Sequence, residues 1–249
     1  MTGQDKSWGG IFPSLCTPFA QDGALDLVCF GLAGEVNKLT PEECKRLAAV
    51  ILEEVDGQVP VLLGVGIEAL HTSNELARDA EAAGASGTVI PPPLTAHLPS
   101  DDLGPYFCAI AAATALPVVI QDAPAHLSVG LSPACIRQCA QTQPNIRCMK
   151  VETGPEGTAP LGDRHRLRGS LAAAEALFRR LLVYLAFSLQ DLDHYNSCTK
   201  EMLVRRGILS RAGLREPALR LRTLGLDLLN GHSAKLELSA PAPGLPVMP

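Results

Sequence analysis

The sequence predicts an α/β fold that is built on a parallel sheet and followed by a helical region. Up to about residue 152, short apolar runs alternate with longer segments of helical periodicity. This order is typical of parallel strands joined by helical crossovers. After about residue 166 the pattern is helical, with no convincing strand. The chain has 249 residues, of which 47% are hydrophobic and 19% charged, which is the balance of a globular protein with a large core.

The first strand is expected at residues 11–15, and the first helix begins after it near residue 40. Thr40 is a favourable N-cap, a proline follows at the first helical position, and two glutamates lie in the first turn. Apolar residues then recur at helical spacing as far as Val55. A β-rich run over residues 59–63 comes next and is closed by a Gly-Val-Gly segment.

Glycine and proline residues mark the limits of the later elements, because they interrupt regular structure. A helix over 72–83 ends at Gly84, and a strand over 87–90 is stopped by three prolines. The other expected elements are a helix over 100–115, a strand over 117–121, a helix over 132–140, a strand over 146–151 and helices over 171–189, 197–206 and 216–229.

These elements divide the chain into a β/α region over 1–165, a helical region over 166–235 and a Pro-rich tail over 236–249 that is expected to be disordered. An eight-stranded α/β barrel uses about this total length. A βαβ unit, however, needs about 30 residues, and at most five strand-plus-helix units precede residue 166. The β/α region is therefore too short for an intact eight-stranded barrel.

Charge and motif content exclude several classes of function. Lys and Arg number 21 against 26 Asp and Glu, so binding of nucleic acid through broad phosphate neutralisation is not expected. No apolar run approaches the ~20 residues of a membrane span, and the polar N-terminus lacks a signal-peptide core, so a cytoplasmic protein without a membrane partner is expected. No nucleotide-binding motif and no metal-ligand spacing occur. Cofactors and metals are therefore not expected.

Five segments are similar, in order, to the dihydrodipicolinate synthase/N-acetylneuraminate lyase family. The segments are residues 10–19 with 22–26, residues 31–35 with 39–43, residues 59–66, residues 117–124 and residues 148–152. The resemblance covers about residues 10–157 and resumes over 181–215, which resemble the C-terminal helices of the family.

The resemblance implies a (β/α)8 barrel with an appended helical region. Enzymes of this family bind pyruvate or a related 2-oxo acid as an imine on a lysine, then make or break a carbon–carbon bond or eliminate water. The chemistry is expected at the carboxyl ends of the strands. Against this pattern, strands 2, 7 and 8 of the barrel are missing, because residues 28–30 and 159–163 leave no room for them. The expected fold is thus barrel-derived and incomplete.

Lys150 matches the imine-forming lysine of the family. An imine forms from the neutral amine, so a lysine in this role needs partial desolvation, and Lys150 ends an apolar strand. From spacing alone, a lysine at a strand end is usually solvated. Glu152 points to the same side if the strand continues, where it either tunes Lys150 or lies in solvent.

The other site residues are also assigned by resemblance. Gly31, Leu32, Ala33 and Gly34 would receive the substrate carboxylate through backbone N–H groups, although a plain turn explains the same segment. Thr17 closes the first strand and would pack or hydrogen-bond beside the lysine.

Gln121 stands where the lysine-biosynthesis members have a catalytic tyrosine, and His126 stands in the place of an arginine that binds a second carboxylate. A carboxamide can donate a hydrogen bond but is no general acid, and Gln121 could simply cap its strand. These replacements disfavour true dihydrodipicolinate synthesis.

The expected activity is that of a carbon–carbon or carbon–oxygen lyase that acts on pyruvate or a related 2-oxo acid through Lys150, in a chain that forms a homo-oligomer. The alternative is a truncated, catalytically inactive member with a structural or interaction role. The two differ in whether Lys150 reacts with a 2-oxo acid.

Overall fold

A computed structural model describes residues 34–66, 68–93, 98–124, 129–152 and 171–236, and no side chains at 171–178 or 180. Within these residues, strands and helices alternate as predicted. The four strands are β1 (Leu62–Gly64), β2 (Gly87–Ile90), β3 (Val118–Asp122) and β4 (Ile146–Val151). They form one sheet in the order β1-β2-β3-β4, and every neighbouring pair is parallel. The predicted α/β fold with a parallel sheet is confirmed.

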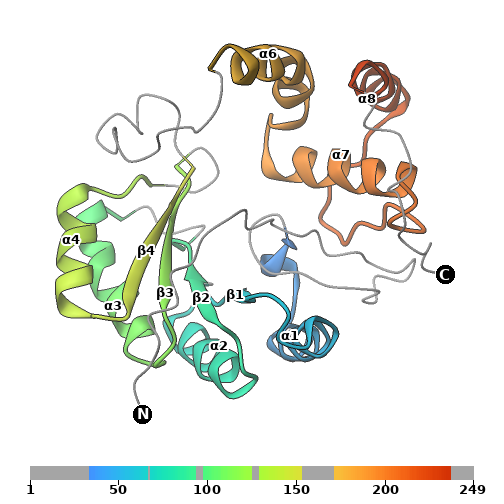
Figure 1. The fold of residues 1–249 in the computed structure, drawn as a ribbon. Coiled ribbons are helices and arrows are strands. Elements are labelled where there is room, and N and C mark those ends of the chain that lie inside the picture. The colour runs from blue at the N-terminus through green and yellow to red at the C-terminus, as the bar shows by residue number, and fades with distance from the viewer. Residues whose placement is uncertain (1–33, 67, 94–97, 125–128, 153–170, 237–249) are drawn as a thin grey trace.

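Helices cover one side of this sheet, as Figure 1 shows. They are α1 (Pro41–Val55), α2 (Leu70–Ala82), α3 (Gly104–Ala111) and α4 (Pro133–Thr142). The core lies between these helices and the sheet and includes the fully buried Ile90, Phe107, Ile110, Val118 and Ile120. Because side chains alternate between the two faces of a strand, every second side chain extends to the face of the sheet opposite these helices.

The start of α1 follows the sequence pattern. The Thr40 hydroxyl accepts a hydrogen bond from the Glu43 backbone N–H at 3.2 Å, and the Glu43 carboxylate accepts one from the Thr40 N–H at 2.8 Å. This reciprocal capping box satisfies two backbone donors that a helix start leaves open. Before it lies the short 3-10 helix η2 (Val36–Lys38).

The helix expected over 100–115 differs from the prediction. It begins as a 3-10 turn, η3 (Ser100–Leu103), continues as α3 and ends at Ala111. The Glu81 carboxylate of α2 accepts hydrogen bonds from the Thr114 hydroxyl and the Ala115 N–H, each at 2.8 Å. These bonds hold the chain after Ala111 in a non-helical path.

In the described residues of the C-terminal region, the helices are α6 (Leu171–Ser188), α7 (Leu192–Arg205) and α8 (Thr223–Lys235). α7 begins five residues earlier than predicted, because Asp191 caps it by accepting from the His194 N–H at 2.8 Å. The helix predicted over 216–229 is wrong in position, since residues 216–222 are not helical. Pro217 lacks an N–H, and Glu216 accepts from the Ala218 N–H instead.

Several predictions fall outside the described residues. They are the strand over 11–15, the short segments 28–30 and 159–163, the region boundary at 165 and the tail after 236. Among the described residues, no helix combines the length and apolarity that a membrane crossing requires.

Candidate functional site

Gln121 and Lys150 lie side by side at the carboxyl ends of two neighbouring strands. They are register partners in the parallel pair β3–β4. Side chains of parallel register partners extend to the same face of a sheet. Their neighbours Ile120 and Met149 are also partners and extend to the other face, where Ile120 joins the core under the helices. Gln121 and Lys150 therefore share the face away from the helices.

Glu152 joins these two side chains. Its carboxylate accepts a hydrogen bond from Gln121 Nε2 at 2.6 Å and contacts Lys150 Nζ through its other oxygen. The backbone N–H of Glu152 donates to the carbonyl of Asp122 at 2.7 Å, which extends the ladder past the end of β4. This extension places Glu152 on the side of Lys150, as the alternation of side chains in a strand predicts.

The three side chains differ in their contact with solvent. Gln121 is 2% exposed, whereas the side chains of Lys150 and Glu152 are 38% and 36% exposed. The Gln121 amide is therefore buried, whereas the Lys150–Glu152 ion pair is partly exposed to solvent. A carboxylate held between an amide donor and an amine can exchange a proton with the amine.

Asp122 supports the chain that leaves this corner. It is buried, and burial raises the pKa of its carboxyl group. Its Oδ1 accepts a hydrogen bond from the Leu131 N–H at 3.1 Å, which opposes the effect of burial on the pKa. This bond holds Leu131, which lies just before α4, beside the end of β3.

A second polar cluster lies around Glu35, directly after Gly34. Both residues are buried, and Glu35 has the left-handed backbone angles φ 54° and ψ 37°. Its carboxylate is 3.0 Å from Lys38 Nζ and also contacts Lys200 Nζ, which comes from α7. Lys200 is fully buried and donates a further hydrogen bond to the Gly213 carbonyl at 3.0 Å.

The C-terminal region also contacts Lys38 and Glu43, which follow Glu35 in the chain. Lys38 Nζ lies 2.8 Å from Asp193 of α7. Burial lowers the pKa of Lys38, but hydrogen bonds to Asp193 and Glu35 outweigh it and raise the pKa above its usual value. Arg215 donates to both carboxylate oxygens of Glu43 at 2.7 Å and to the Lys38 carbonyl at 2.8 Å. The hydrogen bonds from Arg215 lower the pKa of Glu43.

Sequence reasoning missed this cluster. Glu35 and Lys200 are 165 residues apart, and Glu43 and Arg215 are 172 apart. No spacing rule connects such positions, because local patterns extend over a few turns of helix or one strand. The one usable signal in the sequence is Glu35, which directly follows the glycine segment of residues 31–34.

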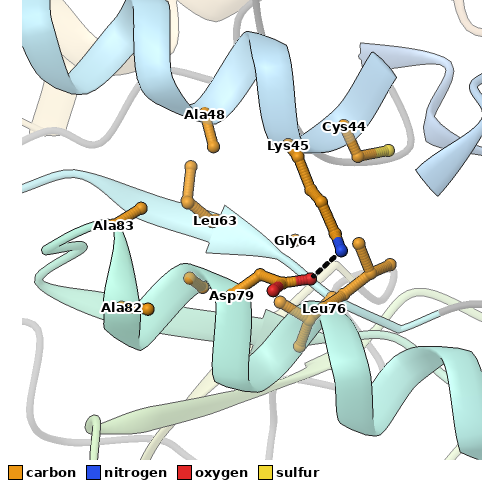
Figure 2. Close-up of a pocket in the computed structure, with 11 residues that line it drawn as sticks. Cys44, Lys45, Ala48, Leu63, Gly64, Leu76, Asp79, Ala82 and Ala83 are labelled. Carbon is orange, nitrogen blue, oxygen red and sulfur yellow. Dashed lines mark ion pairs between the residues drawn. The ribbon is translucent and has the colours of Figure 1, made fainter. Parts of the chain in front are cut away.

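A cavity of about 300 Å³ lies elsewhere, between α1, α2 and β1 (Figure 2). Its lining is largely aliphatic, with Ala48, Leu63 and Leu76 among the residues that face it. Lys45 and Asp79 form an ion pair of 3.0 Å across it. No predicted site residue lines this cavity, so it forms no part of the Lys150 corner.

The other predicted site residues fall outside the described part of the chain: Thr17, Gly31, Leu32, Ala33 and His126. The structure therefore brings together Gln121 and Lys150 and places Gly34 beside the Glu35 cluster. In the described residues, no three or more His, Cys, Asp or Glu side chains are arranged to hold a metal ion.

Comparison with a family model establishes the family of this chain. The model of the dihydrodipicolinate synthetase family matches residues 21–157, which is more than half of the chain. The chain belongs to the dihydrodipicolinate synthetase family. The match includes Gln121, Lys150 and Glu152, and the sequence resemblance to this family is confirmed.

Curated relatives in this family support the assignment. A 4-hydroxy-tetrahydrodipicolinate synthase from Hyphomonas neptunium is 34% identical over 163 residues, which cover 58% of this chain and 55% of that protein. The putative 2-dehydro-3-deoxy-D-gluconate aldolase YagE from Escherichia coli is 32% identical over 161 residues, 57% of this chain and 53% of YagE. The chain spans about half the length of the curated relatives it matches.

Solved structures establish the fold. A crystal structure of dihydrodipicolinate synthase matches with a TM-score of 0.80 at 20% identity, covering 93% of this chain and all of that one. The structure of YagE from E. coli in complex with pyruvate matches with a TM-score of 0.74 at 22% identity, covering 91% of this chain and 97% of YagE. The parallel sheet and its helices are thus part of a family barrel, with the C-terminal helices appended.

Proposed function

We propose that this protein is a lyase that acts on pyruvate or a related 2-oxo acid through an imine on Lys150. The observation that carries the proposal is the Gln121–Glu152–Lys150 arrangement at the carboxyl end of a parallel sheet. In barrels of this kind, residues at the carboxyl ends of strands do the chemistry. Membership of the dihydrodipicolinate synthetase family supports it, as does the pyruvate complex of the related YagE.

Glu152 supplies the proton transfers that imine formation needs. Glu152 first accepts a proton from the Lys150 ammonium group, and the neutral Nζ then attacks the 2-oxo carbon. As the carbon–nitrogen bond forms, Glu152 gives this proton to the carbonyl oxygen, which becomes a hydroxyl group. Glu152 then accepts a second proton from the nitrogen and passes it to the hydroxyl group, which leaves as water while the carbon–nitrogen double bond of the protonated imine forms. Gln121 holds the carboxylate in place through its Nε2 donor. As a carboxamide, Gln121 cannot relay protons itself.

Gln121 also limits the later steps. The proposed enzyme makes or breaks a carbon–carbon bond, or eliminates water, without the phenol of the lysine-biosynthesis members. A 2-oxo acid lyase other than a dihydrodipicolinate synthase is therefore the proposed class. The substrate carboxylate is proposed to bind at the glycine segment that ends with Gly34, as the family resemblance implies.

Trapping with borohydride tests the proposal directly. Purified protein is incubated with pyruvate and borohydride, and adducts are mapped by peptide mass spectrometry, with circular dichroism as a fold control. We expect an adduct on Lys150 in the wild type and none in Lys150→Arg. Lys45→Arg is the matched control, because Lys45 is 52% exposed and lies outside the site. It should trap as the wild type does.

The pattern of labelling separates specific from incidental reaction. Adducts spread over Lys45 and Lys38, with none concentrated on Lys150, would refute the proposal. Labelling of the fully buried Lys200 would report unfolded protein. Glu152→Gln should slow trapping about 100-fold, because a positioned proton acceptor contributes a factor of that order. An unchanged rate would remove Glu152 from the mechanism.

One observation favours the inactive alternative. The Lys150–Glu152 ion pair is more than a third exposed, as in a solvated strand end with no catalytic role. A folded wild type without any adduct would establish this alternative.

A further inference from the structure

We propose that Cys108 and Cys139 are a modification site, at which a small hydroperoxide oxidises the two thiols to a disulfide between α3 and α4. Cys108 lies on α3 and Cys139 lies on α4. Hydrogen peroxide is the simplest oxidant of this class. The inference goes beyond the proposed function and does not depend on it, because no residue of the Lys150 site takes part.

Among the described residues, the thiols of Cys108, Cys135 and Cys139 lie together where α3 packs against α4 (Figure 1). Cys139 Sγ forms hydrogen bonds with the thiols of Cys108 and Cys135. It also donates to the Gly104 carbonyl at 3.7 Å. A Cβ at Gly104 would lie 3.7 Å from Cys139 Sγ and 3.9 Å from Cys135 Sγ. Both sulfur atoms of α4 are therefore close to the first turn of α3, one turn before Cys108.

Geometry decides which thiol pairs with Cys139 in a disulfide. Cys135 and Cys139 lie one turn apart on α4, and Cβ atoms at this spacing in a helix are about 5–6 Å apart. A disulfide needs Cβ atoms about 3.5–4.5 Å apart, so a bond within α4 would distort the helix. Cys108 belongs to the other helix, so a small shift between α3 and α4 closes the bond while both helices stay intact.

The exposure of these thiols sets the order in which they react. Cys135 and Cys139 are 3% and 0% exposed, whereas Cys108 is partly exposed. Burial, together with the nearby Cys108 and Cys135 thiols, raises the pKa of Cys139 to about 12, so Cys139 stays protonated at neutral pH. The thiolate is the form of cysteine that attacks an oxidant. The hydroperoxide therefore oxidises Cys108 first, and Cys139 is the resolving thiol.

The oxidation takes two steps. The Cys108 thiolate attacks one oxygen of the hydroperoxide, a sulfur–oxygen bond forms and the oxygen–oxygen bond breaks. The leaving oxygen takes up a proton, and Cys108 becomes a sulfenic acid. The Cys139 sulfur then attacks the Cys108 sulfur, and the hydroxyl group leaves as water with the Cys139 proton. The two thiols have lost two electrons to the hydroperoxide, and the contact of Cys139 with Cys108 makes the second step intramolecular.

Tryptic mapping after peroxide treatment tests this proposal, because trypsin separates Cys139 from Cys108. Fragment 79–137 contains Cys108 and Cys135, and fragment 138–147 contains Cys139. Reduced protein is treated with hydrogen peroxide at neutral pH, the remaining thiols are blocked, and the fragments are identified by mass spectrometry without reduction. The variant Cys135→Ala decides the assignment, because Cys108 is then the only cysteine of fragment 79–137.

We expect a disulfide between fragments 79–137 and 138–147 in the wild type and in Cys135→Ala, and its loss when a thiol reductant is added. The extent of linking should not change when the protein is diluted about tenfold, because the second step is intramolecular. Cys148→Ala is the matched control and should link as the wild type does. Cys148 is exposed and lies on the strand face of Lys150, away from the helices.

Two variants remove one thiol of the pair each. In Cys139→Ala no link should form, and dimedone should trap a sulfenic acid on Cys108. Cys108→Ala changes the less buried position, so a folded protein is available even if Cys139→Ala is unstable. In Cys108→Ala no link should form and Cys139 should stay reduced. Circular dichroism confirms the fold of each variant.

Several results would overturn the inference. Oxidation of Cys108 to a sulfinic acid without a link, in the folded wild type, would show that Cys139 does not resolve it. A link that disappears in Cys135→Ala would assign the bond to Cys135. Oxidation of Cys148 while Cys108 stays reduced would show that peroxide does not reach the pair. A link that forms only in urea would leave these thiols as packing groups alone.

Discussion

Removing Glu35 should destabilise the fold more than removing Lys200, although the two side chains contact each other. Glu35→Gln takes away the carboxylate that the fully buried Lys200 contacts. Breaking a buried ion pair by removing one partner costs about 3–5 kcal/mol. Lys200→Met, in contrast, leaves Glu35 paired with Lys38 at 3.0 Å. Its expected cost is therefore about 1–3 kcal/mol, the range for one lost buried hydrogen-bonding partner.

Urea unfolding followed by circular dichroism measures both costs at neutral pH. For a chain of this length, 1 kcal/mol shifts the midpoint of thermal unfolding by about 2–4 °C, so thermal melts provide a second reading. The variant Glu35→Gln/Lys200→Met should lose less stability than the two single variants together, by about 0.5–3 kcal/mol, as for residues in contact. A cost of Lys200→Met equal to or above that of Glu35→Gln would refute the role given to Lys38. Additive costs would refute the contact itself.

Three further predictions test separate parts of the structure. Arg215 lowers the pKa of Glu43 from its usual 4.5, so the stability from this pair is present above that value and lost as the pH falls through the lowered one. The difference in unfolding free energy between wild type and Arg215→Met should thus shrink in acid; a difference independent of pH contradicts this. The buried hydroxyl of Thr88 has no hydrogen-bond partner in the described structure, so Thr88→Val should be neutral or stabilise by about 1 kcal/mol in urea unfolding; a clear loss of stability contradicts this. Cys148 is exposed, whereas burial raises the pKa of Cys139 to about 12. A maleimide should label Cys148 before Cys139 in the folded protein, and equal labelling rates at these two residues would contradict the described burial.

Local sequence signals predicted the parts of the fold that depend on local interactions. The capping box at Thr40 uses residues three apart, and the pattern of one helix start contains all of its partners. The strands over 87–90 and 146–151 are confirmed to the residue, and a proline follows the first of them. Side-chain alternation likewise placed Glu152 on the side of Lys150, and the hydrogen bonds of Glu152 agree.

The errors arise where a distant residue or an overlooked proline decides the structure. The helix expected to reach residue 115 stops at Ala111, since Glu81 of α2 binds the chain beyond it. The last helix begins at Thr223 because Pro217 interrupts the apolar pattern that preceded it. Glu35 and Lys200 could not be paired from the sequence, because their contact exists only once α7 packs beside η2.

The two polar clusters are positioned in different ways, one by strand register and the other by contacts between distant side chains. The proposed reacting group, Lys150, lies at a strand end, where register alone places Gln121 beside it. The segment around Glu35 has no such ladder, and the contacts of the Glu35 side chain come from Lys38 and from Lys200 of α7. A loss of about 1–3 kcal/mol in the free energy of unfolding of Lys200→Met would show that α7 supports this segment. An unchanged free energy of unfolding would show that the contact of Glu35 with Lys38 is sufficient.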